Sequence, residues 1–119
     1  MYCNLETITQ CFVFNLISVN RQFNRLYLFQ VSDNVVRVLK EDRLCLTIGG
    51  DHSCGIGTID GHVKAKGDVA VLWVDAHADL NTNATSPTGN IHGMPVALLV
   101  KELSDYWPYL PGMDCQQPM

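Results

Sequence analysis

The sequence has no excess of basic residues and no long hydrophobic run. Eight Lys and Arg stand against twelve Asp and Glu, which gives a formal net charge of −4. Because such a balance offers no basic stripe, we expect neither nucleic acid nor a membrane as a partner. No apolar run reaches the roughly 18 residues that span a bilayer. The apolar stretch 11–17 lacks a preceding basic residue and a following cleavage site, so we expect no signal peptide.

Cysteines are few and follow no metal-binding or disulfide pattern. There are five, an odd number, and no C-x-x-C occurs. A disulfide scaffold or a cysteine zinc site is therefore not expected, and reduced thiols are typical of a cytoplasmic protein. Hydrophobic residues make up 47% of the 119 residues and charged residues 17%. This composition favours one folded domain and argues against a disordered chain.

The hydrophobic pattern predicts a parallel βαβ unit. Residues 1–30 keep neither a helical nor a strand period and form a separate segment of unclear structure. A helix is expected from Ser32 or Asp33, and the apolar run 44–48 reads as a buried strand closed by Gly49 and Gly50. The elements expected next are a helix over 53–66, a parallel strand over 69–74 beside the first, a loop over 76–93 and a helix from Pro95.

Metal-ligand side chains follow both predicted strands. His52 comes after the first, and Asp75, His77 and Asp79 come after the second. Because parallel strands end at the same sheet edge, these groups form a candidate site for divalent metal. Residues two apart on a straight strand are separated by about 6.6 Å, so either the chain curls after residue 74 or two ions are bound.

Nearby residues have structural alternatives. Asp51 is interpreted as a helix N-cap or a support for the metal ligands. His62 lies mid-helix with no partner motif and is read as structural, and Cys54 as a core residue.

The loop before Pro95 adds uncharged polar groups and a third histidine. His92 is placed to move protons, and Asn81, Thr88 and Asn90 offer hydrogen bonds to a polar substrate. The alternative is that all four belong to a polar turn with helix caps.

Three motifs resemble those of the ureohydrolases, and among them the arginase family. They are GGDHS over 49–53, DAHADLN over 75–81 and GNIHG over 89–93. The resemblance covers about Val31 to Gly112. It implies an α/β fold with a three-layer parallel sheet and helices on both faces, incomplete in this chain. It also implies a binuclear manganese centre, hydrolysis of L-arginine to L-ornithine and urea, and a role in arginine metabolism and the urea cycle.

The resemblance also implies roles for individual residues. His52 matches a ligand of one manganese ion, Asp75 the bridging aspartate, His77 a ligand of the other ion and Asp79 a further ligand of the first. His92 resembles the proton-shuttle histidine. Asn81, Thr88 and Asn90 match residues that receive the α-carboxylate of arginine, although arginases often have Ser at the position of Thr88. A homo-oligomer in the cytoplasm, or alternatively the mitochondrion, is expected on the same basis.

The chain departs from the family pattern at its ends. Residues 1–30 and 113–119 do not match, so residues 31–112 are expected to form a partial arginase-like domain between atypical segments. A second aspartate pair and a later glutamate of the family are missing. Three alternatives to an impaired arginase are a non-catalytic metal-binding fragment, an agmatinase-like enzyme and a deacetylase-like enzyme. Asp79 and the loop 89–92 speak against the last, since a single zinc ion does not need the extra carboxylate.

Overall fold

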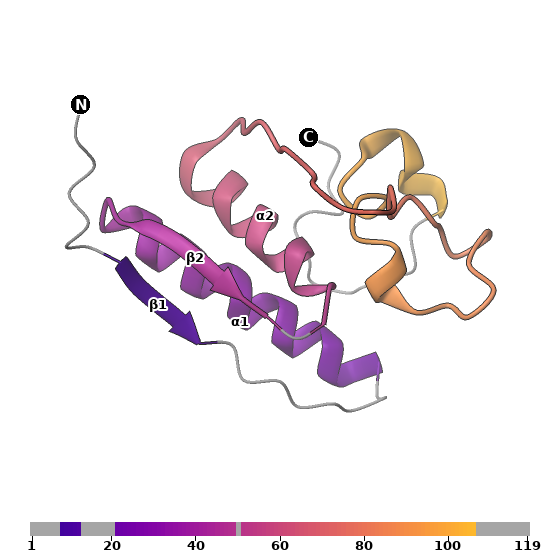
Figure 1. Ribbon diagram of the computed structural model, residues 1–119, viewed down its shortest axis with the longest axis horizontal. Helices are drawn as coiled ribbons and strands as arrows, with labels where there is room; N and C mark the ends of the chain where they lie inside the picture. The colour runs from indigo at the N-terminus through magenta and orange to yellow at the C-terminus, as the bar shows by residue number, and fades with distance from the viewer. Residues whose placement is uncertain (1–7, 13–20, 50, 107–119) are drawn as a thin grey trace.

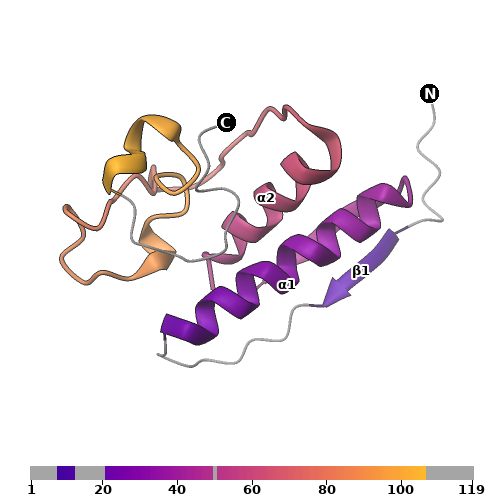
Figure 2. The ribbon, with the colours of Figure 1, turned by 180° about the vertical axis from the view of Figure 1, so that it is seen from behind.

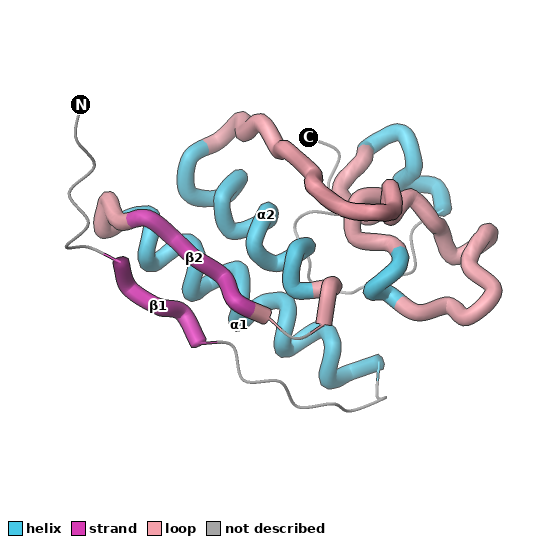
Figure 3. The backbone as a smooth tube through the Cα atoms, in the orientation of Figure 1, coloured by secondary structure: helices cyan, strands magenta, loops and turns pink. Residues whose placement is uncertain are grey.

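Two parallel strands and two long helices form the body of the structure, a computed structural model that describes residues 8–12, 21–49 and 51–106. β1 pairs with β2 in parallel, in a register that runs from Ile8 opposite Leu44 to Phe12 opposite Ile48. Helix α1 lies against the sheet and α2 lies beside α1 (Figures 1 and 3). The elements are β1 Ile8–Phe12, α1 Arg21–Lys40, β2 Leu44–Ile48, α2 Cys54–Lys66, and the 3₁₀ helices η2 Ile91–Gly93 and η3 Lys101–Tyr106.

Helix α1 begins eleven residues before the predicted start at Ser32, so that prediction was wrong. Its apolar stripe already includes Leu28, which recurs with Val31 and Val35 at helical spacing on the buried face. Ser32 does not cap a helix. It is completely buried and donates a hydrogen bond of 2.5 Å to Asp60 of α2. The predicted division of the chain at residue 31 stays a prediction, and α1 runs across it.

Helices α1 and α2 lie side by side (Figure 2), and glycines of α2 let them approach each other closely. A Cβ atom at Gly61 would lie 2.6 Å from the Cβ of Val35, and one at Gly57 would lie 2.6 Å from the carbonyl oxygen of Leu28. Both distances are shorter than real carbon contacts allow. The glycines that weaken α2 as an isolated helix are therefore required where α2 packs on α1.

Residues 69–74 do not form the predicted second strand, although the helix expected before them is present as α2. The strand that pairs with β2 is β1, which comes earlier in the chain. Val71, Leu72 and Val74 are 51%, 89% and 86% exposed. An apolar run forms a parallel strand only where a neighbouring strand and covering helices bury it, and the described residues supply neither here.

The predicted helix from Pro95 is also wrong, because the chain makes a short turn there and continues into η3. The N–H of Ala97 donates to the carbonyl oxygen of Asp79 at 3.2 Å. This long-range bond replaces the bond to residue 93 that a regular helix would make. Met94 and Leu98 nevertheless reach the core beside Ile56, so the loop is anchored to the helices. Within the described ranges, no helix is both long and apolar enough to cross a bilayer.

Candidate metal centre

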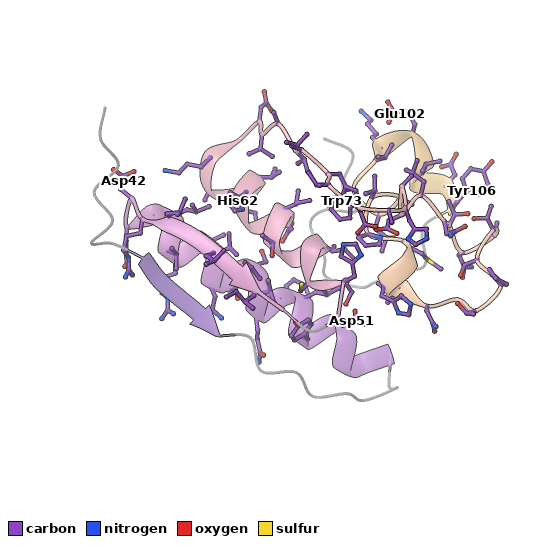
Figure 4. The ribbon with its side chains drawn as sticks, viewed as in Figure 1. Asp42, Asp51, His62, Trp73, Glu102 and Tyr106 are labelled. Carbon is purple, nitrogen blue, oxygen red and sulfur yellow. The ribbon has the colours of Figure 1, made fainter. Side chains whose placement is uncertain are left out.

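Three of the four predicted metal ligands lie together beyond the carboxyl end of β2. His52 precedes α2, and its Nε2 lies 3.7 Å from Oδ2 of Asp75. Its Nδ1 lies 3.2 Å from Oδ2 of Asp79. One ligand atom from each of these residues lies within 4.8 Å of the others. Figure 4 shows the labelled neighbours Asp51 and Trp73 at this end of the structure, with Asp42 at the opposite end.

The chain curls after residue 74, which brings two carboxylates to one place. Asp75 Oδ1 accepts a hydrogen bond of 2.9 Å from the backbone N–H of His77, which closes a tight turn. Asp79 has a φ of 51°, in the left-handed region that Asp tolerates better than most residues. Of the two arrangements left open by the spacing, the structure has the curl. It says nothing against a second ion.

The surroundings of Asp79 suit a cation. Its Oδ2 is buried and makes no hydrogen bond in the structure, although His52 Nδ1 is close. A buried carboxylate oxygen without a donor is costly unless a positive charge faces it. Two ligands of one ion with bonds near 2.1 Å are at most about 4.2 Å apart, so small side-chain rotations would bring the three donors onto one ion. Mixed imidazole and carboxylate donors fit Mn²⁺, Fe²⁺ or Zn²⁺.

An aromatic ring supports His52. The rings of Trp73 and His52 stack with centroids 5.1 Å apart at an interplanar angle of 24°. Gly55 of α2 lies beside the indole of Trp73, where a Cβ atom would be in ordinary van der Waals contact at 3.4 Å. Stacking restricts the imidazole to one plane facing the carboxylates. Sequence reasoning treated Trp73 only as an apolar strand residue, and nothing local to it indicated this contact.

Two further histidines, His77 and His92, lie at the rim of the cluster. His77 Nδ1 is 3.7 Å from Asp75 Oδ1, and its side chain is 83% exposed. The two oxygens of Asp75 therefore face different histidines, His52 and His77. His92 Nδ1 lies 3.8 Å from Oδ2 of Asp51. Asp51 also accepts a hydrogen bond of 2.9 Å from the N–H of Ser53. The N-cap residue of α2 is Ser53, so Asp51 supports the turn before the helix and is not its N-cap as predicted.

The cluster lies in the wall of an open pocket of about 830 Å³. This volume suits a small polar molecule. Asn81, a predicted substrate-binding residue, lines the pocket, as does Thr85, for which the sequence predicted no role. Thr88 and Asn90 are exposed on the same loop but are not part of the lining. The full lining is His52, Asp75, His77, Ala78, Asp79, Leu80, Asn81, Thr85, His92 and Gly93.

Two further residues with side chains that could take part in chemistry, His62 and Cys54, lie outside this lining. Nδ1 of His62 lies 2.9 Å from the carbonyl oxygen of Thr58 one turn earlier in α2, consistent with a structural role. Burial, and to a smaller degree the charge of Asp51, raises the pKa of the Cys54 thiol. The thiol therefore stays protonated at neutral pH and is a poor metal ligand.

Comparison with known proteins identifies the family. The sequence model of the Arginase family matches residues 4–107. Hepatic arginase of Aquarana catesbeiana is 52% identical over 89 residues, which cover 75% of this chain and 28% of that protein. Mitochondrial arginase-2 of Homo sapiens is 43% identical over 106 residues, 89% of this chain and 30% of the relative.

A third relative is similar over nearly the whole chain. Mitochondrial arginase-2 of Bos taurus is 41% identical over 115 residues, 97% of this chain and 32% of the relative. The chain thus spans less than a third of the length of these three relatives. Since the family match covers most of the chain and includes all three motifs, the chain belongs to the arginase family.

Proposed function

We propose that this chain carries part of the site of an arginase-type hydrolase that converts L-arginine and water into L-ornithine and urea. The observation that carries the proposal is the convergence of His52, Asp75 and Asp79 on one point beside an open polar pocket. Membership of the arginase family supports the same chemistry.

Two manganese ions are the proposed cofactor. His52 and Asp79 would hold one ion, His77 the other, and Asp75 both, since its two oxygens face different histidines. These residues would hold the metal, and the chemistry that bound manganese would supply is a water made nucleophilic near neutral pH. The buried Oδ2 of Asp79 supplies negative charge where the cation would lie.

The remaining proposed roles belong to the rim of the pocket. His92 would carry the proton to the side-chain nitrogen of ornithine as the bond between that nitrogen and the guanidinium carbon breaks. Its 3.8 Å contact with Asp51 holds its imidazole at the rim. Asn81 would bind the α-carboxylate of arginine, and Thr88 and Asn90 are proposed to assist from the same loop.

Turnover by this chain alone should be weak. Two ions bring a charge of +4, and Asp75 and Asp79 return only −2. Four protein side chains are few for two ions, so metal retention should suffer. We therefore keep a non-catalytic, metal-binding fragment as the second candidate function. Its supporting observation is that the described residues contain one three-residue metal cluster and not two.

The wider setting is proposed from the family. In a longer chain we expect a three-layer α/β sheet with helices on both faces, of which β1, β2, α1 and α2 form one part. A homo-oligomer in the cytoplasm or the mitochondrion, acting in arginine metabolism, is the corresponding proposal.

The test is a Mn²⁺ titration followed by calorimetry, coupled to a urea assay on the same samples. His52→Ala should weaken Mn²⁺ binding at least tenfold. His62→Ala is the matched control, because the imidazole bonds to a carbonyl oxygen of its own helix and lies outside the pocket lining. Equal binding by both variants would contradict the site. Urea release close to that of an intact arginase would contradict the expected impairment.

A further inference from the structure

Thr85 lines the pocket but has no part in the proposed chemistry. Its hydroxyl oxygen receives a hydrogen bond of 2.9 Å from the backbone N–H of Thr82. The same hydroxyl donates to Oδ1 of Asn81 at 3.2 Å. An N–H group can only donate, so the oxygen of Thr85 accepts there. Two oxygens lie within reach of its own proton, Oδ1 of Asn81 at 3.2 Å and Oγ1 of Thr82 at 3.4 Å, and the Asn81 contact is the shorter.

The turn that carries Thr85 is firmly placed. Thr82 is buried, and its carbonyl oxygen accepts from the N–H groups of Thr85 at 3.2 Å and Ser86 at 2.9 Å. Its hydroxyl also accepts from the N–H of Ala84 at 3.3 Å. These bonds hold the backbone so that the hydroxyl of Thr85 stays beside Asn81.

This contact decides which end of the Asn81 amide is free. A side-chain amide has an accepting oxygen and a donating NH₂ group, and Thr85 occupies the oxygen. In the described part of the chain the NH₂ group has no hydrogen-bond partner, while Asn81 lines the pocket. A donor there attracts a carboxylate, whereas a flipped amide would present an oxygen and repel it.

Other hydroxyls of the loop are used differently. Ser86 Oγ accepts from the N–H of Gly89 at 3.0 Å, and Thr88 Oγ1 accepts from the N–H of Asn90 at 3.3 Å. Both hydroxyls stabilise the turn and lie outside the pocket lining. Among the pocket-lining residues of this loop, Asn81 and Thr85 are the two with uncharged hydroxyl or amide side chains.

We propose that Thr85 is a positioning residue that orients the Asn81 amide and so selects ligands with an α-carboxylate over amines that lack one. The inference rests on the proposed function, and it assigns substrate selection to a residue that does not itself bind substrate. Loss of the hydroxyl should lower the preference for a carboxylate without affecting binding of the guanidinium end.

The experiment uses nuclear magnetic resonance of the ¹⁵N-labelled 119-residue chain. The probes are L-arginine and agmatine, which differ by the α-carboxylate. Thr85→Val removes the hydroxyl and keeps the shape, and Thr85→Ser restores the hydroxyl. Thr58→Val, on α2 and outside the pocket lining, is the control for the substitution itself.

Two readouts are expected to change together. Thr85→Val should weaken L-arginine binding roughly fivefold, the effect of losing one hydrogen bond, and change agmatine binding less than twofold. The side-chain NH₂ of Asn81 should also become more mobile in ligand-free Thr85→Val. Thr85→Ser and Thr58→Val should match the unmodified chain in both measurements.

The two proposals fail in different ways. Unchanged mobility of the Asn81 amide, or equal loss of both ligands in Thr85→Val, would overturn the role of Thr85 while arginine preference in the unmodified chain still stood. An unmodified chain that binds L-arginine no better than agmatine would contradict the proposed function and, with it, the selection of a carboxylate. Whether Thr85 orients the Asn81 amide is then decided by the mobility measurement alone.

Discussion

Replacing Asp79 with Asn tests the metal centre most directly. The amide has the shape of the carboxylate but no charge, so packing around the left-handed residue is kept. Oδ2 of Asp79 is buried, has no hydrogen bond, and lies 3.2 Å from His52 Nδ1. Its side chain is only 9% exposed, so solvent screens it little.

The expected magnitude follows from the loss of one charged ligand. An interaction with a charged group contributes about 1.5–3 kcal/mol, which corresponds to a roughly ten- to 150-fold weaker Mn²⁺ affinity. The assay is the free Mn²⁺ signal in electron paramagnetic resonance during a titration at constant pH. Circular dichroism checks that the variant keeps its helices.

The matched control is Asp68→Asn. It removes the same charge from an exposed residue that lies outside the pocket lining. Because surface charges are screened by salt, Mn²⁺ affinity should change less than about twofold. If Asp79→Asn and Asp68→Asn had the same Mn²⁺ affinity, Oδ2 of Asp79 would not be a metal ligand and the site would need to be reassigned.

Three further predictions concern stability and association. Gly61→Ala should lower the free energy of unfolding by about 1–3 kcal/mol in urea denaturation, because the new methyl group meets α1, whereas Gly55→Ala should not. A more stable Gly61→Ala chain would contradict the close packing. Leu46→Lys should reduce self-association in light scattering, since this exposed residue lies on β2, whose outer edge pairs with no strand among the described residues. Unchanged self-association in Leu46→Lys would mean that β2 is not the edge through which the chains associate. The raised pKa of the Cys54 thiol means that the folded chain binds the thiol proton more tightly than the unfolded chain does. The contribution of this thiol to the free energy of unfolding is therefore complete below pH 9.0 and is lost at higher pH. Cys54→Ala should flatten the fall of the unfolding free energy above pH 9.0, and an unchanged slope would argue against that contribution.

The sequence by itself determined the chemistry and the local elements around the site. Helix α2 and strand β2 depend on neighbouring residues, so the sequence predicted both elements. The expected burial of β2 was wrong, because Leu44, Leu46 and Ile48 are 62%, 46% and 60% exposed. The motif residues His52, Asp75 and Asp79 were identified because their side-chain types and spacing suit a divalent metal. Their meeting at one edge was predicted from strand-end topology, although one of the two strands is absent.

Only the tertiary structure decided how those residues meet. The N–H of Ala97 bonds to Asp79, a contact across eighteen positions that no local period contains, and it replaces a helix with a turn. Ser32 looked like a cap because serine is common there, but its burial against Asp60 decided otherwise. Residues 69–74 have the composition of a strand, yet strand formation requires a neighbour to accept the hydrogen bonds. Such long-range partners are a property of the folded chain, because they depend on which segments tertiary packing brings side by side.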